Sequence, residues 1–384
     1  MRRSTDHILT THVGSLPRSQ QLVDVLLEKD KGGAYDHARY DRVVAEAVSE
    51  AVKLQTEAGI DIPSDGEQSK VSYSTYMMDR LTGFGGDNKR RVALDLKDYP
   101  EFREKMGRMT GAQEFRRASC IGPVAVKDLA PLCADVKNLV AATSAAHVKE
   151  AFMNSASPGL VSAFQPNEYY PSHEAYIEAL SDAMKEEYRI IVDSGLLLQL
   201  DCPDLAMAAH IAFQDLSEVD FLKRAALHVE ALNFALEGID PSRVRMHICW
   251  GNYEGPHDHD IPVEKLFGVI ARAKPQAVLF EAANPRHEHE LVAWKTAKLP
   301  DDKILIPGMI DTCSNFVEHP ELVAQRIERW ANAFGRERIV AGTDCGFGTF
   351  AGYGKLDGRI AWKKLRALAE GAAIATRRLW SKAA

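Results

Sequence analysis

Short apolar segments alternate with longer stretches of helical periodicity along most of this chain. Each apolar segment is rich in aliphatic and β-branched residues and ends in polar or glycine residues. Eight such segments are candidate strands: 8–13, 60–64, 151–155, 196–201, 244–249, 277–281, 304–310 and 339–342. The repeated order of strand and helix predicts parallel strands joined by crossover helices.

Three of the intervening helices are clearly marked, over residues 40–58, 173–193 and 320–334. The last one begins at Pro320 and is followed by Gly335. Proline just inside the start and glycine just past the end are typical of a helix.

Eight parallel strands suit a single (β/α)8 TIM barrel with insertions, in which residues 1–384 form one domain. An open, doubly wound sheet is the alternative fold with the same pattern. Residues 84–126 interrupt the alternation and are expected to form an inserted excursion. Its first part, 84–120, is rich in Arg, Lys and Asp and is expected to be solvated, with a hairpin near 119–126.

The composition is that of a globular protein with a large core, because 46% of the residues are hydrophobic and 26% are charged. A net charge of −7 argues against a general nucleic-acid-binding surface. No apolar run approaches the roughly 18 residues that a membrane span needs, and no apolar segment follows the basic start as in a secretory signal. We therefore expect a cytoplasmic protein that acts on small molecules. The sequence leaves open whether it forms a homo-oligomer.

The six cysteines are widely spaced and too few for a disulfide scaffold in a chain of this length. In a reducing compartment such thiols are core residues, metal ligands or catalytic groups. They are Cys120, Cys133, Cys202, Cys249, Cys313 and Cys345.

Polar residues that follow the predicted strands are the main candidates for chemistry. The carboxyl ends of barrel strands open onto one face, where the active site of such a fold lies. That face would collect an unusual number of ionisable and metal-binding groups: His12, Ser15, Asp65, Glu67, Asp201, His247, Cys249, Glu281, Asp311, Cys313, Asp344 and Cys345.

Four of these residues form a candidate zinc site. His247 and Cys249 are alternate residues of one strand, so their side chains point to the same face. Glu281 ends the next strand and Cys345 follows the last one, which a closed barrel brings back to the first. Two sulfurs, one nitrogen and one carboxylate suit tetrahedral Zn²⁺. With both thiols ionised the site carries a net charge of −1, and a substrate thiolate can replace the carboxylate without changing it. Such a site suits alkylation of a thiol.

Taken together, these motifs resemble the C-terminal catalytic domain of the cobalamin-independent methionine synthase family, especially its shorter single-barrel relatives. The resemblance covers nearly the whole chain in order. It is carried by residues 10–15 (TTHVGS), 65–67 (DGE), 199–203 (QLDCP), 247–249 (HIC), 280–281 (FE), 307–311 (PGMID) and 344–346 (DCG).

The resemblance implies that His247, Cys249, Glu281 and Cys345 bind zinc. It also implies that Ser15, Glu67 and Asp201 hold the amino-acid part of homocysteine. We place Glu281, Cys313 and His12 among the catalytic residues.

Three features depart from the family pattern. A chain of 384 residues has no room for the duplicated N-terminal barrel of the long synthases. Cys202 stands where the synthases have a glutamate, and Cys313 stands where they have a catalytic histidine that assists the folate leaving group. The resemblance therefore points less firmly to methyl-folate as the donor. It extends to epoxyalkane:coenzyme M transferases of the same superfamily.

The sequence thus favours zinc-dependent transfer of an alkyl group, most simply methyl, from a donor to a small thiol, with homocysteine as the favoured acceptor, as in methionine biosynthesis. The alternatives are thiol addition to an epoxide and a lyase of the uroporphyrinogen decarboxylase type. A metal-binding module without activity would leave Glu67 and Asp201 unexplained.

Overall fold

A computed structural model describes residues 1–88, 91–110, 117–354 and 356–381, which form a mixed α/β structure. Its centre is a five-stranded parallel sheet in which the strands follow one another in sequence order. These strands are β3 (Phe152–Ala156), β4 (Leu197–Asp201), β5 (Val244–His247), β6 (Ala277–Phe280) and β7 (Ile304–Pro307). A separate antiparallel pair consists of β1 (Phe84–Gly85) and β2 (Ser119–Cys120).

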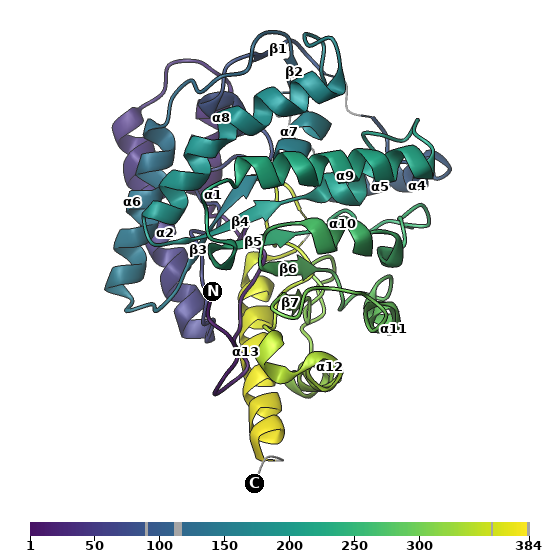
Figure 1. Cartoon of the computed structure of the whole chain (residues 1–384). Coiled ribbons are helices and arrows are strands. Elements are labelled where there is room, and N and C mark those ends of the chain that lie inside the picture. Colours follow the sequence, from purple (N-terminus) through teal and green to yellow (C-terminus); the bar gives the residue numbers. More distant parts are fainter. Residues whose placement is uncertain (89–90, 111–116, 355, 382–384) are drawn as a thin grey trace.

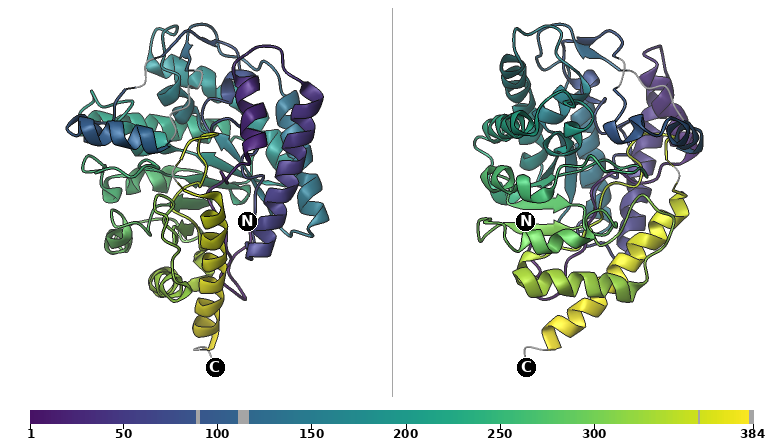
Figure 2. Two further views of the ribbon diagram at one scale, coloured as in Figure 1. Left: turned by 180° about the vertical axis from the view of Figure 1, so that it is seen from behind. Right: turned by 90° about the vertical axis from the view of Figure 1, so that its right-hand side faces the viewer.

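Helices surround the sheet, with α1, α2 and α6 on one side and α10, α11 and α12 on the other (Figures 1 and 2). The long C-terminal helix α13 packs against α12 and α2. The helices are α1 (Gln20–Asp30), α2 (His37–Ala58), α3 (Met77–Arg80), α4 (Leu94–Lys97), α5 (Pro100–Thr110), α6 (Ala130–Ala145), α7 (Pro158–Phe164), α8 (His173–Asp193), α9 (Glu218–Ala235), α10 (Phe267–Arg272), α11 (Leu291–Trp294), α12 (Pro320–Phe334) and α13 (Gly358–Ser381).

Local sequence signals explain where the long helices begin and end. The Ser172 side chain accepts a hydrogen bond from Ala175 N–H and caps α8, and Asp36 caps α2 in the same way. Helix α2 ends at Gly59, whose φ of 87° lies in the left-handed region that glycine adopts without strain. The predicted bounds 173–193 and 320–334 coincide with α8 and α12, and α2 begins three residues before the predicted start.

The three remaining predicted strands, 8–13, 60–64 and 339–342, contribute single parallel bridges rather than full strands. Bridges join Leu305 to Ile339, Thr10 to Ala341, Thr11 to Ile62 and Ser64 to Phe152. The hydrogen-bonded path from β7 therefore runs through these three segments and returns to β3.

The parallel register brings the carboxyl ends of the strands together. Asp201 at the end of β4 pairs with His247 at the end of β5, and His247 pairs with Leu279 on β6. Polar residues that follow these strands consequently lie on one side of the sheet, as the sequence predicts.

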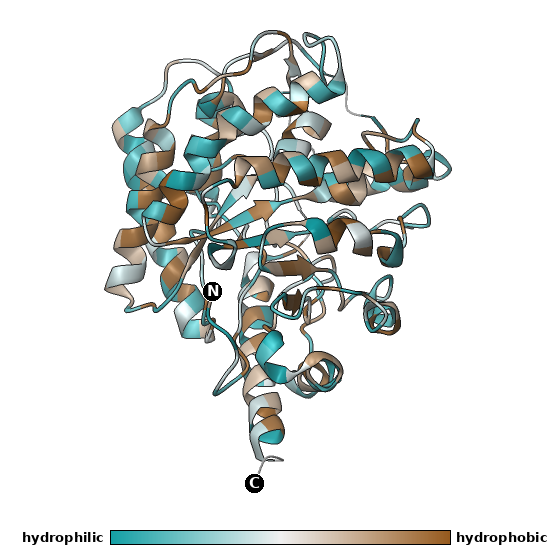
Figure 3. Ribbon diagram, viewed as in Figure 1, coloured by the Kyte–Doolittle hydropathy of each residue, from teal (hydrophilic) through white to brown (hydrophobic). Residues whose placement is uncertain are grey.

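A cluster of buried hydrophobic residues fills the space inside the sheet and the bridging segments. Most of the sheet strands are apolar in Figure 3, whereas the helices alternate apolar and polar bands. Arg245 on β5 is fully buried beside this cluster. Its guanidinium lies 3.9 Å from the centre of the Phe152 ring and donates hydrogen bonds to Gln199 Oε1, Thr11 Oγ1 and the His12 carbonyl. These bonds tie β4 and β5 to the N-terminal segment.

Two details of the excursion differ from the prediction. Residues 119–120 do not form a local hairpin, because β2 pairs with β1 and Val126 bridges to Leu81. The excursion is also only partly solvated, since Ala93 and Leu96 are buried against Met207 and Ile211. Contact with a distant loop, which charge content does not reveal, buries this part of the chain.

Among the described residues, no helix has the length and apolar character required to cross a membrane.

Candidate metal centre and substrate cavity

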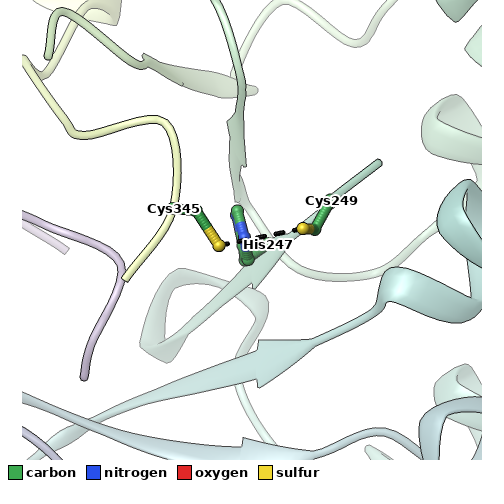
Figure 4. Close-up of side chains that lie close together, drawn as sticks. All are labelled: His247, Cys249 and Cys345. Carbon is green, nitrogen blue, oxygen red and sulfur yellow. Dashed lines mark hydrogen bonds between the residues drawn. The ribbon is translucent and has the colours of Figure 1, made fainter. Parts of the chain in front are cut away.

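His247, Cys249 and Cys345 form a compact group of potential metal ligands. One donor atom from each lies within 4.8 Å of the other two, and the two sulfurs are 3.8 Å apart. His247 ends β5, Cys249 follows it by two positions, and Cys345 comes from the segment after 339–342 (Figure 4). The alternation of side chains along an extended chain therefore brings the imidazole and the first thiol to the same side, as predicted.

The His247 ring is suited to binding a metal. It is buried, and neither ring nitrogen has a hydrogen-bond partner. A buried polar group without a partner is costly and calls for an explanation. Burial, followed by the nearby Arg245 charge, lowers the pKa of His247 to about 3, so the ring is neutral and can bind a metal.

The Cys345 thiol is also suited to binding a cation. The hydrogen bond with Cys249, followed by burial, raises the pKa of Cys345 well above its ordinary value. A thiol in this environment stays protonated until a positive charge arrives, and a bound divalent ion would deprotonate it. The donor set fits zinc or another soft divalent metal.

Glu281 is not part of this three-residue group, although it lies directly after β6. Its Oε1 accepts a hydrogen bond from Trp250 N–H, and its Oε2 accepts bonds from the Asn284 side chain and from Arg286. The carboxylate is thus held beside the cluster by three donors.

Asp344 fixes the segment after Glu281 against the segment that carries Cys345. Its Oδ1 accepts hydrogen bonds from the N–H groups of Ala282 and Ala283. Its Oδ2 accepts bonds from the backbone and side chain of Asn284, both 2.8–2.9 Å long. This carboxylate sets the relative position of two candidate ligands that are far apart in the sequence.

A cavity of about 280 Å³ is lined by the three candidate metal ligands, His247, Cys249 and Cys345. Six residues predicted to bind metal or substrate line it: Ser15, Glu67, Asp201, His247, Cys249 and Cys345. Leu96 and Met106 from the excursion, together with Met207 and Ile211, give it an apolar cover. The cavity therefore combines soft metal-binding donors, carboxylates and an apolar wall.

The two carboxylates of the cavity are fully buried. Burial is the main cause that raises the pKa of Glu67 to about 8 and that of Asp201 to about 6. Asp201 accepts hydrogen bonds from Asn154 and Gln199, which favour its charged form. Lys70 also lowers both pKa values and donates to the Asn154 carbonyl.

Glu67 has an unusual backbone conformation, with φ of 55°. A non-glycine residue in the left-handed region is strained, and such strain is concentrated at functional sites. Asp65 Oδ1 accepts a hydrogen bond from Glu67 N–H and so supports the loop. Gly14 leaves space for the side chains of Glu67 and Asn154, because a Cβ at this position would overlap both of them.

His12 and Cys313 lie outside this cavity. The His12 ring points to α2, where its Nε2 lies 2.6 Å from Gln55 Oε1, and burial lowers its pKa to about 3. It is therefore not placed to touch a ligand in the cavity. Cys313 lines a neighbouring cavity of about 270 Å³, and its thiol donates to Asn252 Oδ1. Asn252 and Tyr253 line both cavities.

Sequence reasoning missed Asn154 and Arg286. Asn154 lies in the buried strand β3 and was detectable as a polar residue within an apolar segment. Arg286 lies in a loop after β6, and its position next to Glu281 carries no sequence signal beyond proximity along the chain.

The chain is similar in sequence to known proteins. Residues 8–94 match the family described as "Cobalamin-independent synthase, Catalytic domain". Methionine synthase of Saccharolobus solfataricus is 25% identical over 378 residues, which cover 97% of this chain and 96% of that protein. Methionine synthase of Sulfolobus acidocaldarius is 24% identical over 376 residues, with 97% and 94% covered.

A solved structure shares the fold. The B12-independent methionine synthase from a Shewanella species, in complex with selenomethionine, superposes with a TM-score of 0.72 at 20% identity, covering 98% of this chain and 99% of that one. The site is a candidate metal centre in an α/β fold. The comparisons confirm the predicted resemblance to the cobalamin-independent methionine synthase family.

The raised pKa of Glu67 predicts a pH-dependent stability. A carboxyl whose pKa rises on folding, here from an ordinary 4.5 to about 8, stabilises the folded state fully below pH 4.5, and this contribution is lost as the pH rises through 8. Between pH 5 and 9, the ligand-free protein should therefore lose ~1–3 kcal/mol more unfolding free energy than Glu67→Gln, at 1.36 kcal/mol per pKa unit and discounted for relaxation. Urea unfolding at several pH values measures this. Glu168→Gln, at an exposed site, serves as the control and should follow the unmodified protein. Parallel stability curves for the protein and Glu67→Gln would contradict the prediction.

Proposed function

We propose that this protein is a zinc-dependent transferase that moves an alkyl group, most simply methyl, to the sulfur of a small thiol, with homocysteine as the favoured acceptor. One observation carries the proposal: the cluster of His247, Cys249 and Cys345 shares a single cavity with the acidic pair Glu67 and Asp201. A thiol amino acid needs a thiolate-binding group at one end and counter-charges for its ammonium at the other. The relatives named methionine synthase support the same reaction.

His247, Cys249 and Cys345 would hold the zinc ion, with Glu281 as the fourth and exchangeable ligand. The unpaired His247 nitrogens and the two neighbouring thiols support this assignment. When bound, the ion would lower the pKa of the acceptor thiol so that its thiolate forms near neutral pH. Glu281 would be the weakest ligand of the four, and Trp250 N–H and the Asn284 amide, which donate hydrogen bonds to it, would stabilise its carboxylate off the metal.

Glu67 and Asp201 would bind the ammonium group of the acceptor, and Ser15 would contact its amino-acid end. An ammonium between the two carboxylates gains charge-assisted hydrogen bonds and favours their ionised forms. The same carboxylates would repel the sulfonate of coenzyme M. The site therefore favours an amino-acid thiol.

In the transfer, the acceptor sulfur supplies the electron pair of the new S–C bond, while the bond between the alkyl carbon and the donor breaks and the donor keeps that pair. Holding both reactants in one enclosed cavity supplies part of the rate. Cys313 lies in the adjoining cavity, where a donor leaving group would take up a proton. Because Cys313 stands where the family has a catalytic histidine, we expect slow or absent turnover with methyl-folate.

We further propose that residues 1–384 form one domain and that the ring of strands and bridges is a (β/α)8 barrel with 84–126 as an inserted excursion. The parallel bridges from β7 back to β3 and the likeness to the Shewanella structure support this fold. We place the protein in the cytoplasm, with a small thiol and an alkyl donor as its ligands.

The zinc assignment predicts one zinc ion per chain. Cys249→Ser and Cys345→Ser should each weaken zinc binding at least ~10-fold, because each replaces a thiolate by a poorer ligand. Metal analysis after dialysis against a chelator measures the loss. Cys133→Ser is the matched control, because Cys133 is exposed and outside the cluster. Full zinc occupancy in both cluster variants would exclude this ligand set.

Exchange of Glu281 predicts a change in the sulfur count at the metal. X-ray absorption of the zinc-loaded protein should show two sulfur neighbours alone and three at saturating homocysteine, because the incoming thiolate replaces the carboxylate. A count that stays at two under saturating thiol would refute the exchange.

Acceptor choice is predicted from the acidic pair. Calorimetry with the zinc-loaded protein should show tighter binding of homocysteine than of coenzyme M. Asp201→Asn should weaken homocysteine binding about 10-fold, since it removes one charge-assisted contact. Tighter coenzyme M binding, with unaltered homocysteine affinity in Asp201→Asn, would instead favour the epoxide-opening alternative.

A further inference from the structure

Arg286 joins the carboxylates of Glu281 and Asp260 through different nitrogens of its guanidinium. Its Nη2 lies 2.5 Å from Glu281 Oε2, and its Nη1 lies 2.8 Å from Asp260 Oδ2. The three side chains are largely shielded from water, with 3% of Glu281, 11% of Asp260 and 19% of Arg286 exposed. An ion pair held from both sides in this environment has a fixed geometry.

The far side of this bridge is anchored in the loop after Cys249, whose Asn252 and Tyr253 line the cavity. Asp260 lies 3.2 Å from His257 Nδ1, and the His257 N–H donates to Asp95 of α4. Tyr253, which lines both cavities, donates its hydroxyl to the same Asp95 oxygen. Arg286 therefore connects Glu281 to Asp260, which contacts His257 of the same loop.

We propose that Arg286 is a positioning residue: it holds the Glu281 carboxylate away from the metal centre and thereby opens the fourth ligand position to an acceptor thiol. The inference rests on the proposed function, because it concerns how readily the exchangeable ligand leaves.

The physical reason is a competition between two cations for one buried carboxylate. A carboxylate displaced into a nearly dry site is costly unless another charge meets it. Trp250 N–H and the Asn284 amide are neutral donors, and His287 Nε2 is 3.8 Å from Glu281 Oε2. Arg286 supplies a permanent charge at hydrogen-bonding distance. Without it, the carboxylate would have the metal as its strongest partner, and a thiol would displace it less easily.

The variant Arg286→Met tests this competition in the zinc-loaded protein. Zinc affinity, measured by competition with a chelator, should be equal to or higher than that of the unmodified protein. Homocysteine affinity, measured by calorimetry, should fall at least ~10-fold, the size expected for loss of a charged hydrogen bond. A merely structural role would weaken zinc and thiol binding together, so the direction of the zinc effect separates the two roles.

Three further variants isolate the pair. In a Glu281→Gln background the substitution Arg286→Met should leave homocysteine affinity within about twofold, because no carboxylate remains to be held. Arg286→Lys keeps the charge but cannot bridge both acids, so it should give a smaller loss and unchanged zinc affinity; it decides the question by itself if Arg286→Met does not fold. Arg378→Met is the matched control. Arg378 of α13 also bridges two carboxylates, Glu321 and Glu328, but both lie on α12, outside the candidate site.

The outcomes distinguish this inference from the proposed function. If the unmodified protein binds no zinc, or gains no sulfur neighbour on thiol addition, both are overturned. If it does both, but Arg286→Met leaves homocysteine affinity unchanged or lowers it equally in the Glu281→Gln background, the role of Arg286 alone is wrong.

Discussion

The carboxylate of Asp344 is the contact on which the candidate site depends. It accepts hydrogen bonds from three consecutive backbone N–H groups after Glu281 and from the Asn284 side chain, and it directly precedes Cys345. One short side chain thereby links the segment that carries the Cys345 thiol to the segment that carries the Glu281 carboxylate. Gly308 leaves space for it, since a Cβ at that position would overlap Asp344 Oδ1. The hydrogen bonds of Asp344 thus set the position of Cys345 relative to Glu281.

The cavity separates two kinds of chemistry by their charge environment. Among the candidate metal ligands, the His247 imidazole is neutral and the pKa of the Cys345 thiol is raised, whereas burial raises the pKa values of the acids Glu67 and Asp201. Both halves would gain from a positively charged partner, which under the proposed function is a metal ion at the candidate ligands and an ammonium group at the two carboxylates. The fully buried Arg245 lowers the pKa of Asp201, and Arg286, which is 19% exposed, forms an ion pair with Glu281 beside the candidate metal ligands.

Much of the fold and part of the site follow from local rules. The alternation of strands and helices predicted parallel pairing, and the bounds of α8 and α12 follow from a Ser172 cap and from Pro320 with Gly335. The two-residue period of an extended chain predicted that His247 and Cys249 face one side. The carboxyl ends of parallel strands meet at the same edge of a sheet. The sequence is therefore enough to place Asp201 and His247 as neighbours, and β4 and β5 pair in this way.

The sequence by itself determined which residue types stand at the strand ends and in what order, because strand period, helix caps and parallel topology act over a few residues. The tertiary structure alone decided how those side chains are used. Gln55 of α2 turns His12 away from the cavity, Arg286 and Asn284 hold Glu281 beside the metal cluster, and Leu96 of the excursion covers the substrate space. Each of these outcomes depends on a contact between segments distant in the chain, or on the rotamer that a buried charge adopts to find its partner. No periodic pattern along the sequence encodes such contacts.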